Sequence, residues 1–264
     1  MPKGMNWTIE AMMIDRVFGD AGSRVLLEEC LVGREASLMI FTDGRDYKSI
    51  VPAQDYKRAY DGDRGPNTGG MGSFSTPGLI DAATLARVES EIIEPTLEGM
   101  IAEGTPFSGV LYAGLMLTSE GPRLIEYNAR LGDPETQGVL VRLESDLVEI
   151  FEAIYERRVG RASVCWSNFS SVCVVAASAG YPGEFDKGKL ISGLDEASAI
   201  EGVTIFHAGT MRNQQGRFLT SGGRVLGVTA SSSTLHDARE TAYQAMGKTN
   251  FEGMHYRKDI AAVA

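Results

Sequence analysis

The segment 110–128 constrains the fold most, because it predicts two neighbouring strands joined by a short turn. The apolar runs 110–117 and 122–127 have strand character, and the turn sequence SEG lies between them. Strands this close in sequence form a hairpin, since a parallel pair needs a much longer crossover. The second strand then runs into the polar sequence LIEYNARLGDPETQ, which occupies residues 124–137.

The end of this second strand carries residue types that suit a metal ion and a phosphate. Glu126 and Asn128 are two positions apart, so both side chains point to the same face of the strand. A carboxylate and an amide oxygen are hard ligands that Mg²⁺ takes together with water and phosphate oxygens. Arg130 adds the fixed cation that a transferring phosphoryl group needs. An isolated Glu-x-Asn pair is more often a solvent-facing strand end, so the pattern alone leaves both interpretations open.

A second polar segment, GPNTGGMG at 65–72, has four glycines among its eight residues. Glycine lets backbone N–H groups approach an anion closely, so such a loop is typical of phosphate or carboxylate binding. The loop lacks the spacing of a P-loop and of a dinucleotide fingerprint, and a purely structural turn is the alternative. The nearby charges of Asp55, Lys57 and Arg58 are suited to an amino acid or a phosphate.

The run RVLL at 24–27 predicts a buried strand, and EECL follows at its exit. At the end of a buried strand, the backbone N–H and C=O groups near Glu28 and Leu31 can form hydrogen bonds with an adenine ring. Glu35, four residues past Leu31, is within reach of ribose hydroxyls. Acidic residues of this kind are commonplace, and an ordinary surface role is the alternative interpretation.

The remaining periodicity predicts helices separated by short strands. Alternation predicts a strand at 37–42, followed by the hairpin signal Asp43-Gly44. The polar segment 54–75 has neither period, and a long loop of this sort inside a compact domain is usually functional. After Gly160 short β-rich runs predict a second domain. Helical periodicity predicts helices at 8–18, 81–103 with a break at Pro95, 145–158 and about 233–247.

Composition narrows the classes of function. The chain has 264 residues, 43% of them apolar and 23% charged, which is ordinary for a globular protein with a real core. A net charge of −10 argues against a nucleic-acid or anionic-membrane surface. No signal peptide and no apolar run of about twenty residues occurs, so we expect a soluble, cytoplasmic protein. The three cysteines and three histidines form no zinc pattern, and no motif supports a serine or cysteine nucleophile.

Six segments, in this order, closely resemble the phosphoribosylamine–glycine ligase (glycinamide ribonucleotide synthetase) family of ATP-grasp enzymes. They are EECLVGRE, AQDYKRAYDGDRGPNTGGMG, GVLYAGLM, LIEYNARLGDPETQ, FHAGT and SGGRVLGVTA. The resemblance covers about residues 18–261 and implies an α/β (α+β) fold. A partial ATP-grasp domain with a mainly antiparallel sheet would occupy 1–165, and a small β-rich C-terminal domain would occupy 166–264.

The resemblance implies an ATP-dependent ligation of purine de novo synthesis, in which glycine is joined to 5-phosphoribosylamine through glycyl phosphate. Glu126 and Asn128 would hold Mg²⁺ or Mn²⁺, and Arg130 would be the catalytic residue that stabilises the transferring phosphoryl group. ATP would meet Glu28, Leu31 and Glu35. The glycine and phosphoribosylamine side would be lined by Asp55, Lys57, Asn67, Thr68, Gly69, Gly70, Asp133 and Glu135.

Two features depart from the family's pattern. Many ATP-grasp enzymes carry a third acidic metal ligand on the preceding strand, where this chain has Ala113-Gly114. The family's N-terminal Rossmann-like domain and its Gly/Lys phosphate loop are matched by no segment here. The resemblance therefore implies that this chain alone is inactive, and that it is either part of a longer ligase or the partner of a complementary N-terminal half on another chain.

Two alternatives follow from these departures. One is a non-catalytic fragment that folds and binds nucleotide or a complementary half. The other is a different ATP-grasp ligase, which joins another acid to another amine, and the GPNTGGMG and DPETQ blocks count against it.

Overall fold

The computed structural model describes residues 5–262 and divides them into two units, one ending at Val32 and one beginning at Gly33. The first unit contains helix α1 (Met5–Met13) and a 3₁₀ helix, η1 (Gly19–Ser23). The helix predicted at 8–18 therefore ends earlier than expected.

The prediction of a buried strand at 24–27 is wrong. Residues 24–32 form no regular element, and the side chains of Leu26 and Leu27 are 80% and 63% exposed. An apolar run becomes a strand only where a partner supplies backbone hydrogen bonds, and residues 5–32 contain no strand to provide them.

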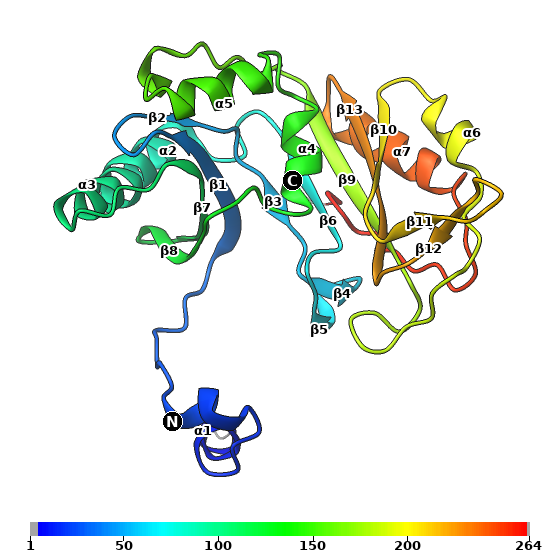
Figure 1. Cartoon of the computed structure of the whole chain (residues 1–264), viewed down its shortest axis with the longest axis horizontal. Coiled ribbons are helices and arrows are strands. Elements are labelled where there is room, and N and C mark those ends of the chain that lie inside the picture. The colour runs from blue at the N-terminus through cyan, green and yellow to red at the C-terminus, as the bar shows by residue number, and fades with distance from the viewer. Residues whose placement is uncertain (1–4, 263–264) are drawn as a thin grey trace. The chain divides into compact units, whose positions relative to one another are not determined.

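A four-stranded antiparallel sheet begins the second unit, with strand order β2-β1-β7-β8 (Figure 1). The strands are β1 (Arg34–Thr42), β2 (Tyr47–Ser49), β7 (Gly109–Thr118) and β8 (Gly121–Asn128). Strand β1 pairs with β2 on one side and along its whole length with β7 on the other. The two predicted hairpins, β1–β2 and β7–β8, are therefore confirmed.

Helices cover both faces of this sheet, because successive side chains of β1 point to opposite sides. Leu38 and Ile40 pack in one core with residues of α2 (Ala82–Val88), the π-helix η2 (Glu89–Ile93) and α3 (Glu94–Ala102). Met39 and Phe41 pack in another core with α5 (Leu147–Tyr155) and the 3₁₀ helix η3 (Val159–Arg161). The helix predicted at 81–103 is thus interrupted at η2, just before Pro95.

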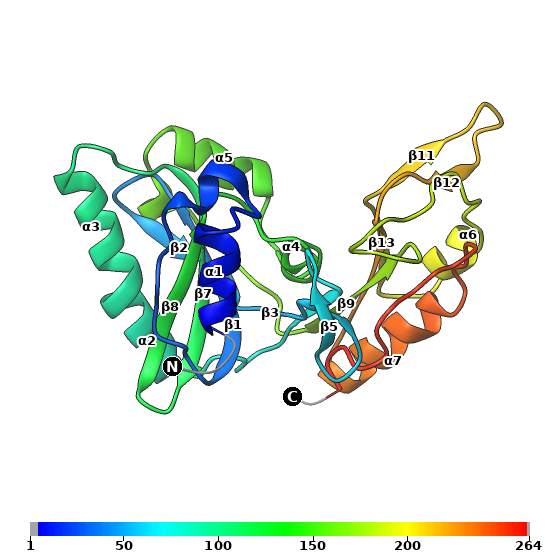
Figure 2. The ribbon, with the colours of Figure 1, turned by 90° about the horizontal axis from the view of Figure 1, so that it is seen from below.

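A five-stranded antiparallel sheet follows, with order β10-β13-β9-β6-β3. Helix α7 (Leu235–Met246) lies along β9 and β13 (Figure 2), and α4 (Glu135–Leu140) contacts β6 and β9. Another short helix, α6 (Leu194–Ser198), contacts β10 and α7. The strands are β3 (Gln54–Asp55), β6 (Gly72–Ser75), β9 (Ser170–Ala177), β10 (Val203–His207) and β13 (Arg224–Ser232).

Two small hairpins complete the fold. They are β4 (Arg58–Tyr60) with β5 (Arg64–Asn67), and β11 (Thr210–Arg212) with β12 (Phe218–Thr220). The polar segment 54–75 therefore contains short paired strands, although it shows no strand period. Because β3 and β6 join β9, the domain boundary that we propose at 165/166 separates segments that share one sheet. No helix within residues 5–262 is long and apolar enough to cross a bilayer.

Asp43 fixes the turn between β1 and β2 and ties it to the segment after α5. Its Oδ1 accepts hydrogen bonds from the backbone N–H groups of Arg45 (3.1 Å) and Asp46 (2.9 Å). Its Oδ2 accepts one from the N–H of Val159 (3.0 Å), and the residue is buried.

Replacing this carboxylate leaves three backbone N–H groups without their acceptor. We expect Asp43→Ala to lower the free energy of unfolding in urea by about 3 kcal/mol. As a control, Asp146→Ala removes an exposed cap of α5, where Oδ1 accepts from the N–H of Val148, and should lower it by about 1 kcal/mol. Equal losses in the two variants would contradict the role of Asp43.

Candidate functional site

A cavity of about 160 Å³ lies at the end of β8 and brings together most of the predicted site residues. Its walls come from the end of β3, the glycine-rich loop 65–72, strand β8 and the turn before α4. The lining residues are Asp55, Lys57, Thr68, Gly69, Tyr112, Glu126, Asn128, Arg130, Gly132, Asp133 and Glu135.

The predicted metal pair lies on one wall of this cavity. Glu126 and Asn128 share one face of β8, and Asn128 Nδ2 lies 3.4 Å from Glu126 Oε1. Gly114 of β7 faces Glu126, and a β-carbon at Gly114 would lie 3.3 Å from Glu126 Cγ. A larger residue at 114 would therefore press on the Glu126 side chain. Arg130 is exposed, and its guanidinium donates to the carbonyl of Leu131 (3.0 Å).

Glu135 also lines this cavity. It is buried and accepts hydrogen bonds from two hydroxyls, Tyr112 and Ser37, for which the sequence analysis predicted no role. Tyr112 Oη donates to Glu135 Oε1 at 2.8 Å, and Ser37 Oγ donates to the same oxygen at 3.0 Å. Burial, together with the Glu135 charge, raises the pKa of Tyr112, so its hydroxyl stays protonated as a donor. Ser37 and Tyr112 lie on β1 and β7, and only the pairing of those strands brings them to Glu135.

Asp55 and Lys57 form a charged boundary of the cavity. Burial and the negative charge of Glu135 raise the pKa of Asp55 to about 7. Burial opposes the charge of Lys57, but Asp55 and Glu35 outweigh it and raise the Lys57 pKa. Lys57 Nζ lies 3.0 Å from Glu35 Oε2, so the predicted ribose-binding carboxylate is paired with a predicted substrate-binding cation.

A second cavity, of about 570 Å³, lies on the other side of Asp55 and Lys57 and shares these two residues with the first. Glu35 and Asn67 line it, together with Arg34. The predicted residues thus divide between two adjoining cavities rather than one. Glu28 and Leu31 belong to the unit that ends at Val32, and their roles stay predictions.

Arg224 joins the glycine-rich loop to the turn before α4. Its Nη1 donates to the carbonyl oxygens of Gly69 (2.7 Å) and Asp133 (3.0 Å). It also forms a two-point ion pair with the Asp133 carboxylate, each N···O distance being 3.2 Å. Gly70 has a φ of +111°, and a β-carbon there would lie 2.3 Å from Pro134 Cδ, so glycine is required for this approach.

Arg224 has no role in the sequence-based prediction, although it lies in the segment SGGRVLGVTA. The one sequence feature that could have pointed to Arg224 is its position as a charged residue at the start of a predicted apolar strand. Its partners lie more than ninety positions away, and only the five-stranded sheet reveals them.

The cavity suits a divalent cation that keeps ligands from water or from a bound nucleotide. Four carboxylates and two cationic side chains line it, so its net charge is negative. Within residues 5–262 no three His, Cys, Asp or Glu side chains are grouped as a complete metal site. Glu126 and Asn128 would supply two hard oxygen ligands, which fits the sparse protein coordination of Mg²⁺ in nucleotide-binding enzymes.

Comparison with known proteins identifies related chains. Residues 5–136 match the family described as phosphoribosylglycinamide synthetase, ATP-grasp (A) domain, and residues 171–263 match its C domain. The phosphoribosylamine–glycine ligase of Caldanaerobacter subterraneus subsp. tengcongensis is 47% identical over 254 residues, which cover 96% of this chain and 60% of the relative. The ligase of Vigna unguiculata is 48% identical over 248 residues, covering 93% of this chain and 80% of the relative.

A solved structure shows the same fold. The crystal structure of the Thermotoga maritima phosphoribosylamine–glycine ligase superposes with a TM-score of 0.77 at 40% identity, over 88% of this chain and 57% of that one. The chain thus spans about 60% of the length of the bacterial relatives it matches. The predicted mixed fold of helices and antiparallel sheet is confirmed. Two matching domains and close relatives along almost its whole length show that the chain belongs to the phosphoribosylamine–glycine ligase family.

Proposed function

We propose that this chain serves in the ATP-dependent ligation of glycine to 5-phosphoribosylamine, which gives glycinamide ribonucleotide, ADP and phosphate. Family membership supports this reaction. The observation that carries the proposal is the cavity at the end of β8, where Glu126 and Asn128 lie with Lys57 and Arg130. A ligase that forms an acyl phosphate needs a cation-binding pair next to fixed positive charges, because both act on phosphoryl oxygens.

The proposed reaction has two steps. A glycine carboxylate oxygen first attacks the γ-phosphorus of ATP, and the bond from that phosphorus to the ADP oxygen breaks. The amine of phosphoribosylamine then attacks the acyl carbon of glycyl phosphate, phosphate leaves, and the nitrogen loses a proton. We assign Arg130 to the first step, where its charge offsets the negative charge on the transferring group.

The other site residues are assigned by what they offer. Mg²⁺ or Mn²⁺, held by Glu126 and Asn128, would neutralise nucleotide phosphates when bound. Glu28, Leu31 and Glu35 are assigned to ATP. Glycine and phosphoribosylamine are assigned to Asp55, Lys57, Asn67, Thr68, Gly69, Gly70, Asp133 and Glu135.

The metal assignment predicts the behaviour of a double variant. Glu126→Gln with Asn128→Ala removes the carboxylate charge and the amide oxygen, so it should abolish Mg²⁺-dependent ADP binding in isothermal titration calorimetry. Glu120→Gln changes an exposed carboxylate at the turn of the same hairpin and should leave binding intact. Unchanged binding in the double variant would remove the metal assignment.

The pKa of Asp55 predicts how glycine binding depends on pH. With a pKa of about 7, this carboxyl holds a proton below neutral pH in the free chain. A bound ammonium group favours the ionised form, so the proton must leave when the amino group of glycine binds. We expect the affinity for glycine, measured calorimetrically with MgADP present, to rise from pH 6 to pH 8. Asp55→Asn should abolish this rise, and a flat pH profile in the unaltered chain would contradict the assignment.

The ligation itself is tested by ADP release with ATP, Mg²⁺, glycine and phosphoribosylamine. The assay is made on this chain alone and again after adding, as a separate polypeptide, the part of the Caldanaerobacter ligase that this chain does not cover. ADP release that requires both glycine and phosphoribosylamine supports the proposal. Nucleotide binding without ADP release in either assay favours a non-catalytic fragment, and absence of nucleotide binding contradicts both.

A further inference from the structure

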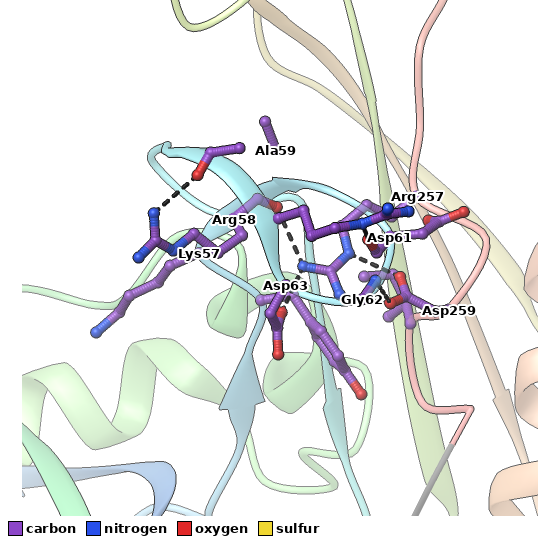
Figure 3. Close-up of polar contacts among 12 residues, drawn as sticks. Lys57, Arg58, Ala59, Asp61, Gly62, Asp63, Arg257 and Asp259 are labelled. Carbon is purple, nitrogen blue, oxygen red and sulfur yellow. Dashed lines mark hydrogen bonds and ion pairs between the residues drawn. The ribbon is translucent and has the colours of Figure 1, made fainter. Parts of the chain in front are cut away.

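The C-terminal segment 255–261 packs against the hairpin β4–β5, and Arg257 lies at the centre of this contact (Figure 3). Its side chain is 1% exposed, although a guanidinium carries a permanent charge. Removing such a group from water is expensive, and only good geometry with several partners offsets the expense. The contacts of Arg257 therefore fix the relative positions of the groups that surround it.

Arg257 has partners on both of its sides. Its Nε and Nη2 donate to the two carboxylate oxygens of Asp259, both at 2.7 Å. Its Nη1 donates to Asp63 Oδ1 (2.8 Å) and to the carbonyl oxygen of Arg58 (3.1 Å). The guanidinium carbon lies 4.8 Å from the centre of the Tyr56 ring, within the range of a cation–π contact.

Further bonds join the same two segments. The hairpin contributes a backbone carbonyl, a backbone N–H and a carboxylate, and Tyr56 just before it contributes a phenol, so the contact does not depend on one residue type. The bonds are His255 Nε2 with the Ala59 carbonyl (2.8 Å), Lys258 N–H to Asp61 Oδ1 (2.8 Å), Gly62 N–H to Asp259 Oδ2 (2.8 Å) and Ala261 N–H to Tyr56 Oη (2.9 Å).

Lys57 lies between two residues that this contact holds. Tyr56 precedes it and Arg58 follows it, while its own carbonyl accepts hydrogen bonds from the N–H and hydroxyl of Thr68 (2.7 and 2.9 Å). Figure 3 shows the Lys57 side chain extending away from Arg257. The backbone around Lys57 is therefore fixed, and its ammonium group is directed to Glu35, 3.0 Å away.

We propose that Arg257 is a positioning residue for the candidate site: by holding Tyr56 and Arg58, it sets the place of the Lys57 ammonium group. This inference rests on the proposed function, in which Lys57 belongs to the substrate side. The competing explanation is that Arg257 only anchors the end of the chain. In that case its loss lowers stability and leaves Lys57 unchanged in the folded protein.

Acetylation of Lys57 distinguishes these explanations. Only the neutral amine reacts, so a lysine held beside carboxylates reacts slowly with an N-hydroxysuccinimide ester of acetic acid. The measurement is the rate at Lys57 divided by the rate at the exposed Lys248, taken by peptide mass spectrometry at pH 8 on folded protein. We expect Arg257→Gln to raise this ratio by about threefold or more, because the ammonium group is released from its carboxylate neighbours.

Two further variants complete the experiment. Arg142→Gln replaces another buried arginine, which donates to Ser75 and Ser167, and it should lower stability without changing the ratio. If Arg257→Gln does not fold, Asp63→Asn decides. Asp63 is largely exposed and has a φ of +51°, a conformation that asparagine tolerates, so this variant weakens the ion pair alone. It should raise the ratio in the same direction, though less.

The positioning role is overturned if the ratio of acetylation rates at Lys57 and Lys248 is unchanged in folded Arg257→Gln. If that variant does not fold, an unchanged ratio in Asp63→Asn overturns it. An equal rise in Arg142→Gln does so too, since it would reflect general loosening. Failure of the proposed function gives a different result: MgADP with glycine would leave the Lys57 ratio of the unaltered chain unchanged. The two failures are therefore distinguishable in the same measurement.

Discussion

The pairing of β6 with β9 is the interaction on which the candidate site depends. It places Gly72 opposite Val174 and Ser75 opposite Ser171, and so joins the segment after the glycine-rich loop to the C-terminal β unit. The approach is close, because a β-carbon at Gly72 would lie 2.7 Å from the carbonyl oxygen of Cys173. Any other residue at 72 would push the strands apart.

Several contacts of the site follow from this pairing. Ser73 of β6 donates to the carbonyl of Pro134 at 2.8 Å, which holds the turn that leads into α4. Strand β9 pairs with β13, and β13 begins at Arg224, whose side chain reaches Gly69 and Asp133. The glycine-rich loop and the turn before α4 thus meet because one sheet contains strands from both halves of the unit.

The sequence predicts those features of the fold and of the candidate site that depend on neighbouring residues, and it misses those that depend on contacts between distant segments. Glu126 and Asn128 share a face because strands have a period of two, and the hairpins have turn residues between apolar runs, so neighbouring residues sufficed. The partners of Ser37, Tyr112 and Arg224 are not their neighbours in the sequence, and only the pairing of the strands brings them together. The wrong prediction of a strand at 24–27 has the same cause, because a strand needs a second segment to pair with, and the sequence of one segment does not show whether a partner is present.

The two arginines supplied by the C-terminal region show why the site cannot be assigned to the first sheet alone. Arg224 donates to backbone carbonyls of two loops and to a carboxylate, and Arg257 donates to a backbone carbonyl and to two carboxylates. A planar guanidinium has five N–H donors in fixed directions, so it fixes the angle between its partners as well as their distance. An ammonium group offers one centre and does not impose that angle.

These contacts also explain how an acidic cavity keeps its shape. Asp55, Glu126, Asp133 and Glu135 repel one another at short range, and a flexible wall would let them separate. The Asp133 carboxylate is paired with Arg224, and the backbone that carries Lys57 is held by Arg257. Lys57 is the cation that acts on Asp55 and Glu126, but its ammonium group is also paired with Glu35, so it balances these two carboxylates only in part. The excess negative charge therefore stays in the cavity at the end of β8, because the walls cannot move apart to reduce the repulsion. A cation that enters the cavity offsets this charge.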